Sequence, residues 1–227
     1  MKTERITVEG RECRIYRHEN AEVMLIQPAD ADSLEHMDKL TAELDERSSK
    51  PYILATFAVK EWNNELSPWE SPAVFGKDAF GGRAEGTLAY VTECLLPYIR
   101  EHYDRDRDIP VIIGGYSLAA LFSLWAVYET GVFSACAAAS PSVWFPGWDG
   151  FVKDRKPFAD CVYLSLGDKE EKVKNPVMSA VGDNIRDLYD KLKNDCPRCT
   201  LEWNEGNHFK DVSIRCARAF AWCISAF

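Results

Sequence analysis

The chain has 227 residues, of which 46% are hydrophobic and 28% are charged. This length suits one large domain, and the balance is typical of a globular protein rather than a disordered or fibrous one. The formal net charge of −9 argues against nucleic acid as a partner, because phosphate binding needs a basic surface. We therefore expect a single domain over residues 1–227 that does not bind nucleic acid.

The N-terminus and the cysteines indicate the compartment. The first five residues, Met1–Arg5, are charged and no apolar stretch follows them, so we expect no signal peptide. No apolar run approaches the roughly 20 residues that a membrane span needs, and we expect no membrane partner. Most of the eight cysteines lie inside apolar segments, which is typical of reduced thiols in a cytoplasmic protein.

Two cysteines, Cys196 and Cys199, have the C-x-x-C spacing of half a metal site. A zinc site would need a second pair of ligands near them in the sequence, and the chain offers none. We therefore expect no metal site.

The N-terminal third of the chain predicts strands, a helix and a buried strand. Residues 5–9, 12–17 and 22–27 are short β-rich runs separated by turns, and they predict an antiparallel unit. Residues 32–47 carry apolar side chains at helical spacing, with Asp32 or Ser33 as the N-cap. Residues 52–59 form a continuous apolar run, as expected for a strand buried on both faces.

The remainder alternates helices and strands. Residues 60–82 predict a long irregular loop, and loops of this length in a compact domain are usually functional. A helix over 84–103, bent near Pro97, is expected to follow it. The later elements are strands from Val111 and over 133–139, 161–166 and 200–204, and helices over 117–130, 176–193 and 211–226.

This alternation predicts an α/β fold. Strands that alternate with helices form a parallel sheet with helices on both faces. The β-rich N-terminal part then supplies an antiparallel edge.

The most informative motif is Gly115-Tyr116-Ser117-Leu118-Ala119, between an apolar strand and a helix. A sharp strand-to-helix turn exposes the serine hydroxyl above the sheet and needs small residues two positions before and after it. Gly115 and Ala119 meet that requirement. The motif predicts Ser117 as a nucleophile, and the backbone N–H of Leu118 as a donor to the oxyanion.

A nucleophilic serine needs a base, and the chain has four histidines. His18, His36 and His102 lie among charged residues and are expected at the surface. His208 follows a predicted strand and precedes the last helix, so it belongs to the sheet edge where the C-terminal ends of parallel strands place ligand-binding loops. We expect His208 to be the base.

A third group should orient the histidine and stabilise its cation. The strand over 161–166 ends in Gly167-Asp168-Lys169-Glu170-Glu171, at the same edge of the sheet. Its three carboxylates, Asp168, Glu170 and Glu171, all remain candidates. Each of them gives the chain order serine, acid, histidine, which is the order of α/β-hydrolases.

The chain resembles the α/β-hydrolase superfamily and, within it, the compact group that contains esterase D and the enterochelin esterases. The resemblance covers residues 52–227 and is carried by five stretches. These are Trp62–Trp69, Gly114–Ala119, Ser140–Trp144, Leu166–Glu170 and Gly206–Phe209.

The resemblance implies the α/β-hydrolase fold and serine esterase activity without a cofactor. In similar proteins the acid lies three residues after the glycine that ends the strand, which is Glu170 here, with Asp168 and Glu171 as alternatives. Some siderophore esterases of the group use a serine–histidine pair alone, so the need for an acid stays open.

Two further site features follow from the loops at this edge. We expect a second oxyanion donor at the start of the loop after the strand over 52–59, near Val59 or Lys60. Aromatic residues of the 60–82 and 140–150 loops either cap the core or wall an acyl or aryl pocket. As substrate-binding residues we predict Trp62, Trp69, Tyr116 and Trp144.

The leading hypothesis is a serine carboxylesterase for a small-molecule ester, with Ser117, His208 and Glu170 as the triad. Acyl transfer to an alcohol by the same residues is one alternative. A binding module without activity is the other, because a fold does not fix a function. The sequence leaves the oligomeric state and the physiological ester open.

Overall fold

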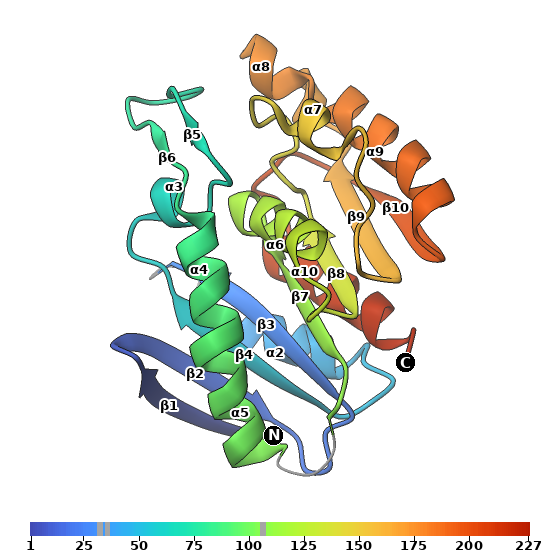
Figure 1. Ribbon diagram of the computed structural model, residues 1–227. Coiled ribbons are helices and arrows are strands. Elements are labelled where there is room, and N and C mark those ends of the chain that lie inside the picture. Colours follow the sequence, from blue (N-terminus) through green and yellow to red (C-terminus); the bar gives the residue numbers. More distant parts are fainter. Residues whose placement is uncertain (31–33, 35–36, 105–107) are drawn as a thin grey trace.

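The computed structural model describes residues 1–30, 34, 37–104 and 108–227, and its centre is an eight-stranded sheet (Figure 1). The order of strands is β1-β2-β4-β3-β7-β8-β9-β10. β1 and β2 pair antiparallel at one edge, and all pairs from β4 to β10 are parallel. The predicted fold class is therefore confirmed. The strands are β1 (Lys2–Val8), β2 (Arg11–Arg17), β3 (Val23–Ala29), β4 (Tyr52–Ala58), β7 (Val111–Tyr116), β8 (Ala135–Ala139), β9 (Cys161–Gly167) and β10 (Arg198–Asn204).

The third strand differs from the prediction. β3 does not continue the antiparallel unit but lies between β4 and β7, parallel to both. All seven of its residues are buried. A strand that is apolar on both faces is stable only inside a sheet whose two faces are covered, and this explains its central place.

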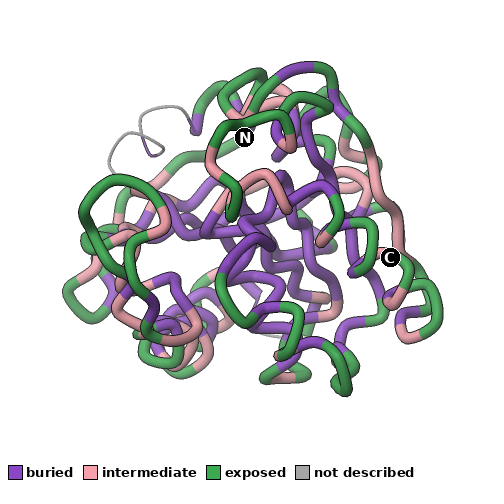
Figure 2. The backbone as a smooth tube through the Cα atoms, turned by 90° about the horizontal axis from the view of Figure 1, so that it is seen from above, coloured by how far each residue is buried: buried purple, intermediate pink, exposed green. Residues whose placement is uncertain are grey.

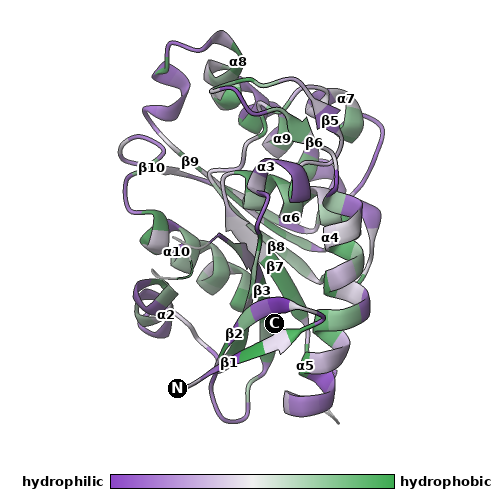
Figure 3. Cartoon of the chain, turned by 90° about the vertical axis from the view of Figure 1, so that its left-hand side faces the viewer, coloured by the Kyte–Doolittle hydropathy of each residue, from purple (hydrophilic) through white to green (hydrophobic). Residues whose placement is uncertain are grey.

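Helices cover both faces of the sheet (Figure 3). One face packs against α2 (Met37–Asp45) and α10 (Val212–Ile224). The other packs against α4 (Ala84–Tyr90), α5 (Leu96–Tyr103), α6 (Leu118–Glu129) and α9 (Val181–Asp195). Buried residues accordingly fill the middle of the molecule (Figure 2). His36 and the N-cap predicted at Asp32 or Ser33 lie outside the described residues.

The predicted 60–82 loop has structure of its own. It begins with α3 (Trp62–Glu65) and continues as a hairpin of β5 (Glu70–Ser71) and β6 (Phe80–Gly81). This hairpin projects beyond the C-terminal edge of the sheet (Figure 1). The 140–150 loop likewise leads into α7 (Trp148–Val152).

Two predicted helices are interrupted. A π-helical turn at Val91–Leu95 joins α4 to α5, and Pro97 is the second residue of α5. Such a widened turn accommodates proline, which has no backbone N–H to donate to the preceding turn of the helix. The helix expected over 176–193 is divided into α8 (Pro176–Ser179) and α9. Within the described residues, no helix is both long and apolar enough to cross a membrane.

Candidate active site

Ser117 lies at the turn between β7 and α6. Its φ of 59° and ψ of −121° are rare for a residue with a side chain. The turn is held by Ser117 N–H, which donates to Ala139 O at 3.3 Å, and by Ser117 O, which accepts from Ser142 N–H at 3.2 Å. The strand, the strained turn and the helix therefore follow in the predicted order.

The small residues on both sides of Ser117 have a steric cause. A Cβ placed on Gly115 would lie 2.8 Å from the Cβ of Ala119, closer than real Cβ atoms approach. The first turn of α6 thus folds back directly onto the end of β7. Glycine at position 115 and a small residue at position 119 make that approach sterically allowed.

The nucleophile candidate has a hydroxyl neighbour. Ser117 Oγ and Ser142 Oγ lie 3.3 Å apart, at hydrogen-bonding distance. Leu118 is the first residue of α6, so its backbone N–H has no acceptor within the helix. This leaves the amide free to bind an oxyanion beside Ser117.

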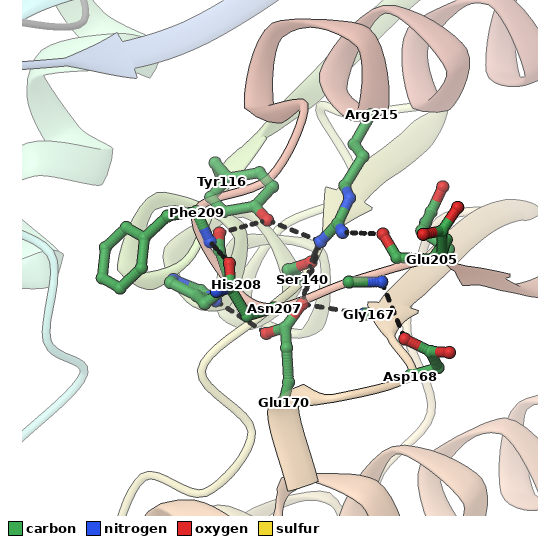
Figure 4. Close-up of polar contacts among 12 residues, drawn as sticks. Tyr116, Ser140, Gly167, Asp168, Glu170, Glu205, Asn207, His208, Phe209 and Arg215 are labelled. Atoms are coloured by element: carbon green, nitrogen blue, oxygen red, sulfur yellow. Dashed lines mark hydrogen bonds and ion pairs between the residues drawn. The ribbon is translucent and has the colours of Figure 1, made fainter. Parts of the chain in front are cut away.

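His208 lies on the loop between β10 and α10 and contacts Glu170. His208 Nδ1 donates to Glu170 Oε2 at 2.6 Å (Figure 4). Glu170 begins a short 3-10 helix, Glu170–Lys172, after the C-terminal end of β9. Nδ1 is thereby held as the protonated nitrogen, so Nε2 is available as a base.

The other two acid candidates have different contacts. Asp168 Oδ1 accepts from Gly206 N–H at 2.7 Å, and Lys169 N–H donates to Gly206 O at 3.1 Å. Asp168 thus ties the loop that carries His208 to the end of β9. Glu171 forms an ion pair with Arg186 on α9 at 2.9 Å. Of the three carboxylates, Glu170 is the one that contacts His208.

A polar cluster surrounds the other oxygen of Glu170 (Figure 4). Oε1 accepts from Gly167 N–H at 2.7 Å, Ser140 Oγ at 2.8 Å and Arg215 Nη1 at 3.1 Å. Arg215 is 1% exposed and Glu170 is 6% exposed. We define the polar cluster as Tyr116, Ser140, Glu170 and Arg215.

Tyr116 connects this cluster to the histidine loop. Its hydroxyl donates to His208 O at 2.7 Å and accepts from Arg215 Nη1 at 3.0 Å. Arg215 Nη2 donates to Glu205 O at 3.0 Å on the same loop. The arginine and the tyrosine therefore hold the backbone of this loop at Glu205 and at His208 itself.

The hydrogen-bonding partners of Glu170 keep it ionised. Burial raises its pKa, but the hydrogen bond and charge of His208, the Gly167 amide and the Ser140 hydroxyl outweigh burial and hold the pKa below its usual value. The pKa of Tyr116 is raised, first by burial and then by the charge of Glu170. Tyr116 therefore stays a neutral hydrogen-bond donor.

Ser117, Leu118, Glu170 and His208 line one cavity of about 310 Å³. Most of its remaining wall is apolar and comes from loops and helices at the C-terminal edge of the sheet. The aromatic side chains of this wall are Trp62, Phe75, Phe80, Trp144 and Phe209.

The predicted substrate-binding residues have different positions. Trp62 and Trp144 line the cavity. Trp69 instead packs against Phe145 at 5.6 Å between ring centroids, and its indole N–H donates to Pro146 O. Trp69 thus joins the hairpin to the 140–150 loop, and Tyr116 belongs to the polar cluster rather than the cavity wall.

The predicted second oxyanion donor, Lys60, has a partner of its own. Glu65 Oε1 accepts from the N–H groups of both Lys60 and Glu61, at 2.9 Å each. Lys60 is not part of the cavity wall, whereas Trp62 and Asn63 of the same loop are. The residues of this loop that line the cavity therefore lie two to three positions after Lys60.

Ser140, Ser142 and Arg215 were not predicted as site residues, and neither were the cavity-lining Phe75 and Phe80. The two serines flank Pro141 at the C-terminal end of β8, beside the nucleophile strand. Their signal was the stretch Ser140–Trp144, one of the five that carry the resemblance, at this edge of the sheet. The sequence does not distinguish Arg215 from Arg218, which follows it at helical spacing. Only the fold shows that Arg215 is buried and Arg218 is exposed.

The cysteines are free thiols and six of the eight are buried. Cys196 is the C-cap of α9, and Cys199 is the second residue of β10. Within the ranges that the structure describes, no group of three or more histidine, cysteine, aspartate or glutamate side chains is placed to hold a metal ion.

Comparison with known families identifies the chain. Residues 19–194 match the model of the family described as "Putative esterase", a segment that includes Ser117 and Glu170 and ends before His208. The chain belongs to this esterase family. It is therefore a hydrolase of carboxylic esters.

Solved structures similar to this esterase share its fold. An IroE-like serine hydrolase from Shewanella oneidensis is 16% identical, with a TM-score of 0.80 over 99% of this chain and 80% of that one. Siderophore hydrolase EstA from Aspergillus nidulans is 15% identical, with a TM-score of 0.76 over 99% and 94%. The enterobactin esterase FES from Shigella flexneri is 14% identical, with a TM-score of 0.66 over 100% and 60%.

Proposed function

We propose that this esterase hydrolyses a small-molecule carboxylic ester through an acyl-enzyme, with Ser117, His208 and Glu170 as its triad. The observation that carries the proposal is the 2.6 Å contact between His208 Nδ1 and Glu170 Oε2, beside a cavity that Ser117 also lines. A histidine held in this tautomer presents a basic nitrogen to a serine hydroxyl.

In the proposed acylation, Ser117 Oγ attacks the ester carbonyl while His208 Nε2 takes the hydroxyl proton. Glu170 stabilises the resulting imidazolium without being protonated. The C–O bond to the alcohol then breaks, and His208 returns the proton to the leaving oxygen. A water molecule, activated by His208 in the same way, releases the acid and restores Ser117.

The oxyanion of each tetrahedral intermediate needs preorganised donors. Leu118 N–H at the start of α6 is the first. For the second we propose a backbone N–H of Trp62 or Asn63 in place of Lys60. Both residues line the cavity and begin α3, whereas the amide of Lys60 is engaged by Glu65.

Ser142 has a role in the resting enzyme under this proposal. Its hydroxyl, 3.3 Å from Ser117 Oγ, holds the nucleophile until the substrate arrives. Catalytic hydrogen bonds often form fully only with bound substrate, and we expect Ser117 to turn to His208 Nε2 at that stage.

The buried thiols support a reducing compartment, and we propose the cytoplasm.

An active-site probe tests this function. A fluorophosphonate should label wild-type protein at Ser117, and Ser117→Ala should abolish both labelling and hydrolysis of p-nitrophenyl acetate. Ser142→Ala is the matched control, because it removes the neighbouring hydroxyl and should leave labelling in place. Persistent labelling of Ser117→Ala would refute the assignment of the nucleophile.

A further inference from the structure

The cavity beside Ser117 differs in character from the polar cluster next to it. Its apolar side chains come from α3, the β5–β6 hairpin, the start of α6, the β8–α7 loop, residues 173–181 and the loop that carries His208. The rings of Phe75, Phe80 and Trp144 meet one another at 5.8–6.2 Å between centroids. Further apolar contributions come from Trp62, Val173, Met178 and Val181.

Charge is scarce on this wall. Among the described residues that line the cavity, only Glu170 and His208 are ionisable, and both belong to the proposed triad. The neutral polar side chains of the lining are Asn63 and the three serines, Ser117, Ser140 and Ser142.

Three basic residues near the site, Arg215, Arg186 and Lys210, have other partners. Arg215 Nη1 and Nη2 donate to Glu170, Tyr116 and Glu205. Arg186 is paired with Glu171 at 2.9 Å, and Lys210 with Glu205 at 3.0 Å. No lysine or arginine is among the described residues that line the cavity, so an anionic group inside it would face the Glu170 carboxylate without a cation on the wall.

From this distribution we propose that the substrate is an ester whose enclosed part is uncharged and apolar, with a single aromatic ring as its best-fitting shape. The proposal rests on the proposed function, because it concerns the ester that Ser117 attacks. Burying a carboxylate in an apolar wall without a cation is strongly unfavourable, so charge is the property by which this cavity selects.

The size of the cavity limits the enclosed group. About 310 Å³ is near the lower end of the range of ligand pockets, which runs from roughly 300 to 1,000 Å³. One ring with a short linker fills such a space. The exposed rings of Phe75 and Phe209, 47% and 84% accessible, extend the apolar surface outwards from the cavity.

A series of isosteric esters tests the selection by charge. We would compare methyl esters of three arylpropanoic acids that differ only in the para substituent of the ring: isopropyl, carboxamide or carboxylate. The substituents have similar shapes, and the methyl leaving group leaves the acyl side as the only part that can fill the cavity. Acetates of the three matching arylethanols repeat the series on the alcohol side.

We expect kcat/KM to fall in the order isopropyl, carboxamide, carboxylate. The carboxylate ester should be at least about 100-fold poorer than the isopropyl ester in whichever series is turned over faster, because an unpaired buried charge is costly. A carboxylate ester within about threefold of its isopropyl analogue would overturn the proposal.

Fluorophosphonate labelling distinguishes failure of the substrate proposal from failure of the proposed function. If a fluorophosphonate labels Ser117 but none of the neutral aryl esters is hydrolysed, the substrate class is wrong and the proposed nucleophile stands. If Ser117 is not labelled, the proposed function itself fails.

A charge placed on the cavity wall sharpens the test. Phe75→Arg puts a cation on the exposed part of the wall, and it should raise kcat/KM for the carboxylate ester relative to the isopropyl ester by about tenfold or more. Phe75→Leu is the matched control and should leave the preference for the neutral ester in place. An unchanged ratio in Phe75→Arg would contradict selection by charge.

Discussion

The two sides of His208 differ in the kind of side chain that they present. On one side, Glu170, Arg215, Ser140 and Tyr116 form a buried polar cluster in which each charge has hydrogen-bonding partners. On the other side lies a cavity with a largely apolar wall. Under the proposed mechanism, the comparison teaches that one part of the site fixes the triad, while the other determines which ester reaches it. Changes on the first side should affect kcat and stability, and changes on the second should affect KM.

The largest effect is expected where the two sides meet, at His208. His208→Ala should lower kcat/KM for p-nitrophenyl acetate by about 10⁴-fold or more, because members of a triad act as a unit. His102→Ala is the matched control, since His102 is exposed and bonds to Tyr98 O on α5. Equal losses in both variants would point to a general effect on folding and contradict the assignment.

The next largest effect tests the polar cluster through its acid. Glu170→Gln keeps the shape of the side chain but removes the charge that stabilises the imidazolium, and kcat should fall by about 10²- to 10⁴-fold with little change in KM. Glu171→Gln breaks only the ion pair with Arg186 and should leave kcat within about twofold. Activity retained in Glu170→Gln would show that a serine–histidine pair suffices.

The stability of the cluster can be tested at Arg215. Arg215→Met removes one partner of a buried ion pair and should lower the free energy of unfolding by about 3–5 kcal/mol in urea titrations. Arg218→Met, on the same helix, breaks an exposed pair with Glu202 and should cost at most about 1 kcal/mol. Similar losses for the two arginines would refute the special role of the buried one.

The apolar side is tested at its tryptophans. Trp144→Ala should raise KM for a neutral aryl ester by about tenfold, because it removes part of the cavity wall, whereas kcat should change less. Trp69→Ala serves as the comparison, since Trp69 packs on the 140–150 loop outside the cavity. A larger rise in KM for Trp69→Ala than for Trp144→Ala would contradict the assignment of Trp144, rather than Trp69, to the substrate cavity.

The smallest effect concerns pH and stability. The pKa of Glu170 is lowered in the folded protein, so its contribution to stability is fully present above the ordinary carboxyl pKa and is lost as pH falls through the lowered folded-state value. The difference in unfolding free energy between wild type and Glu170→Gln should therefore shrink below about pH 4.5. A difference that grew on acidification would contradict the direction of the shift.

Much of the fold follows from local patterns in the sequence. Alternating strands and helices predicted the parallel sheet, and the glycine and alanine around Ser117 predicted the turn that the close approach of Gly115 and Ala119 explains. The central place of β3 was not predictable from its turns. Short β-rich runs suit hairpins and sheet interiors alike, and only pairing with β4 and β7 decides between them.

The site was less predictable, because its details depend on contacts between distant segments. The sequence placed three carboxylates after β9, and their separate partners, His208, Gly206 and Arg186, come from other parts of the chain. The position of Lys60 after β4 suggested an oxyanion donor, but the structure shows its backbone N–H donating to the Glu65 carboxylate. A side chain that turns back on a loop leaves no periodic signal.

The most direct test of the account compares fluorophosphonate labelling of wild type and His208→Ala, with the labelled residue located by peptide mass spectrometry. The account predicts that both proteins are modified at Ser117, and that the histidine variant reacts at least about 10³-fold more slowly, because its serine has lost the base. Modification at another residue, or equal rates in the two proteins, would contradict it.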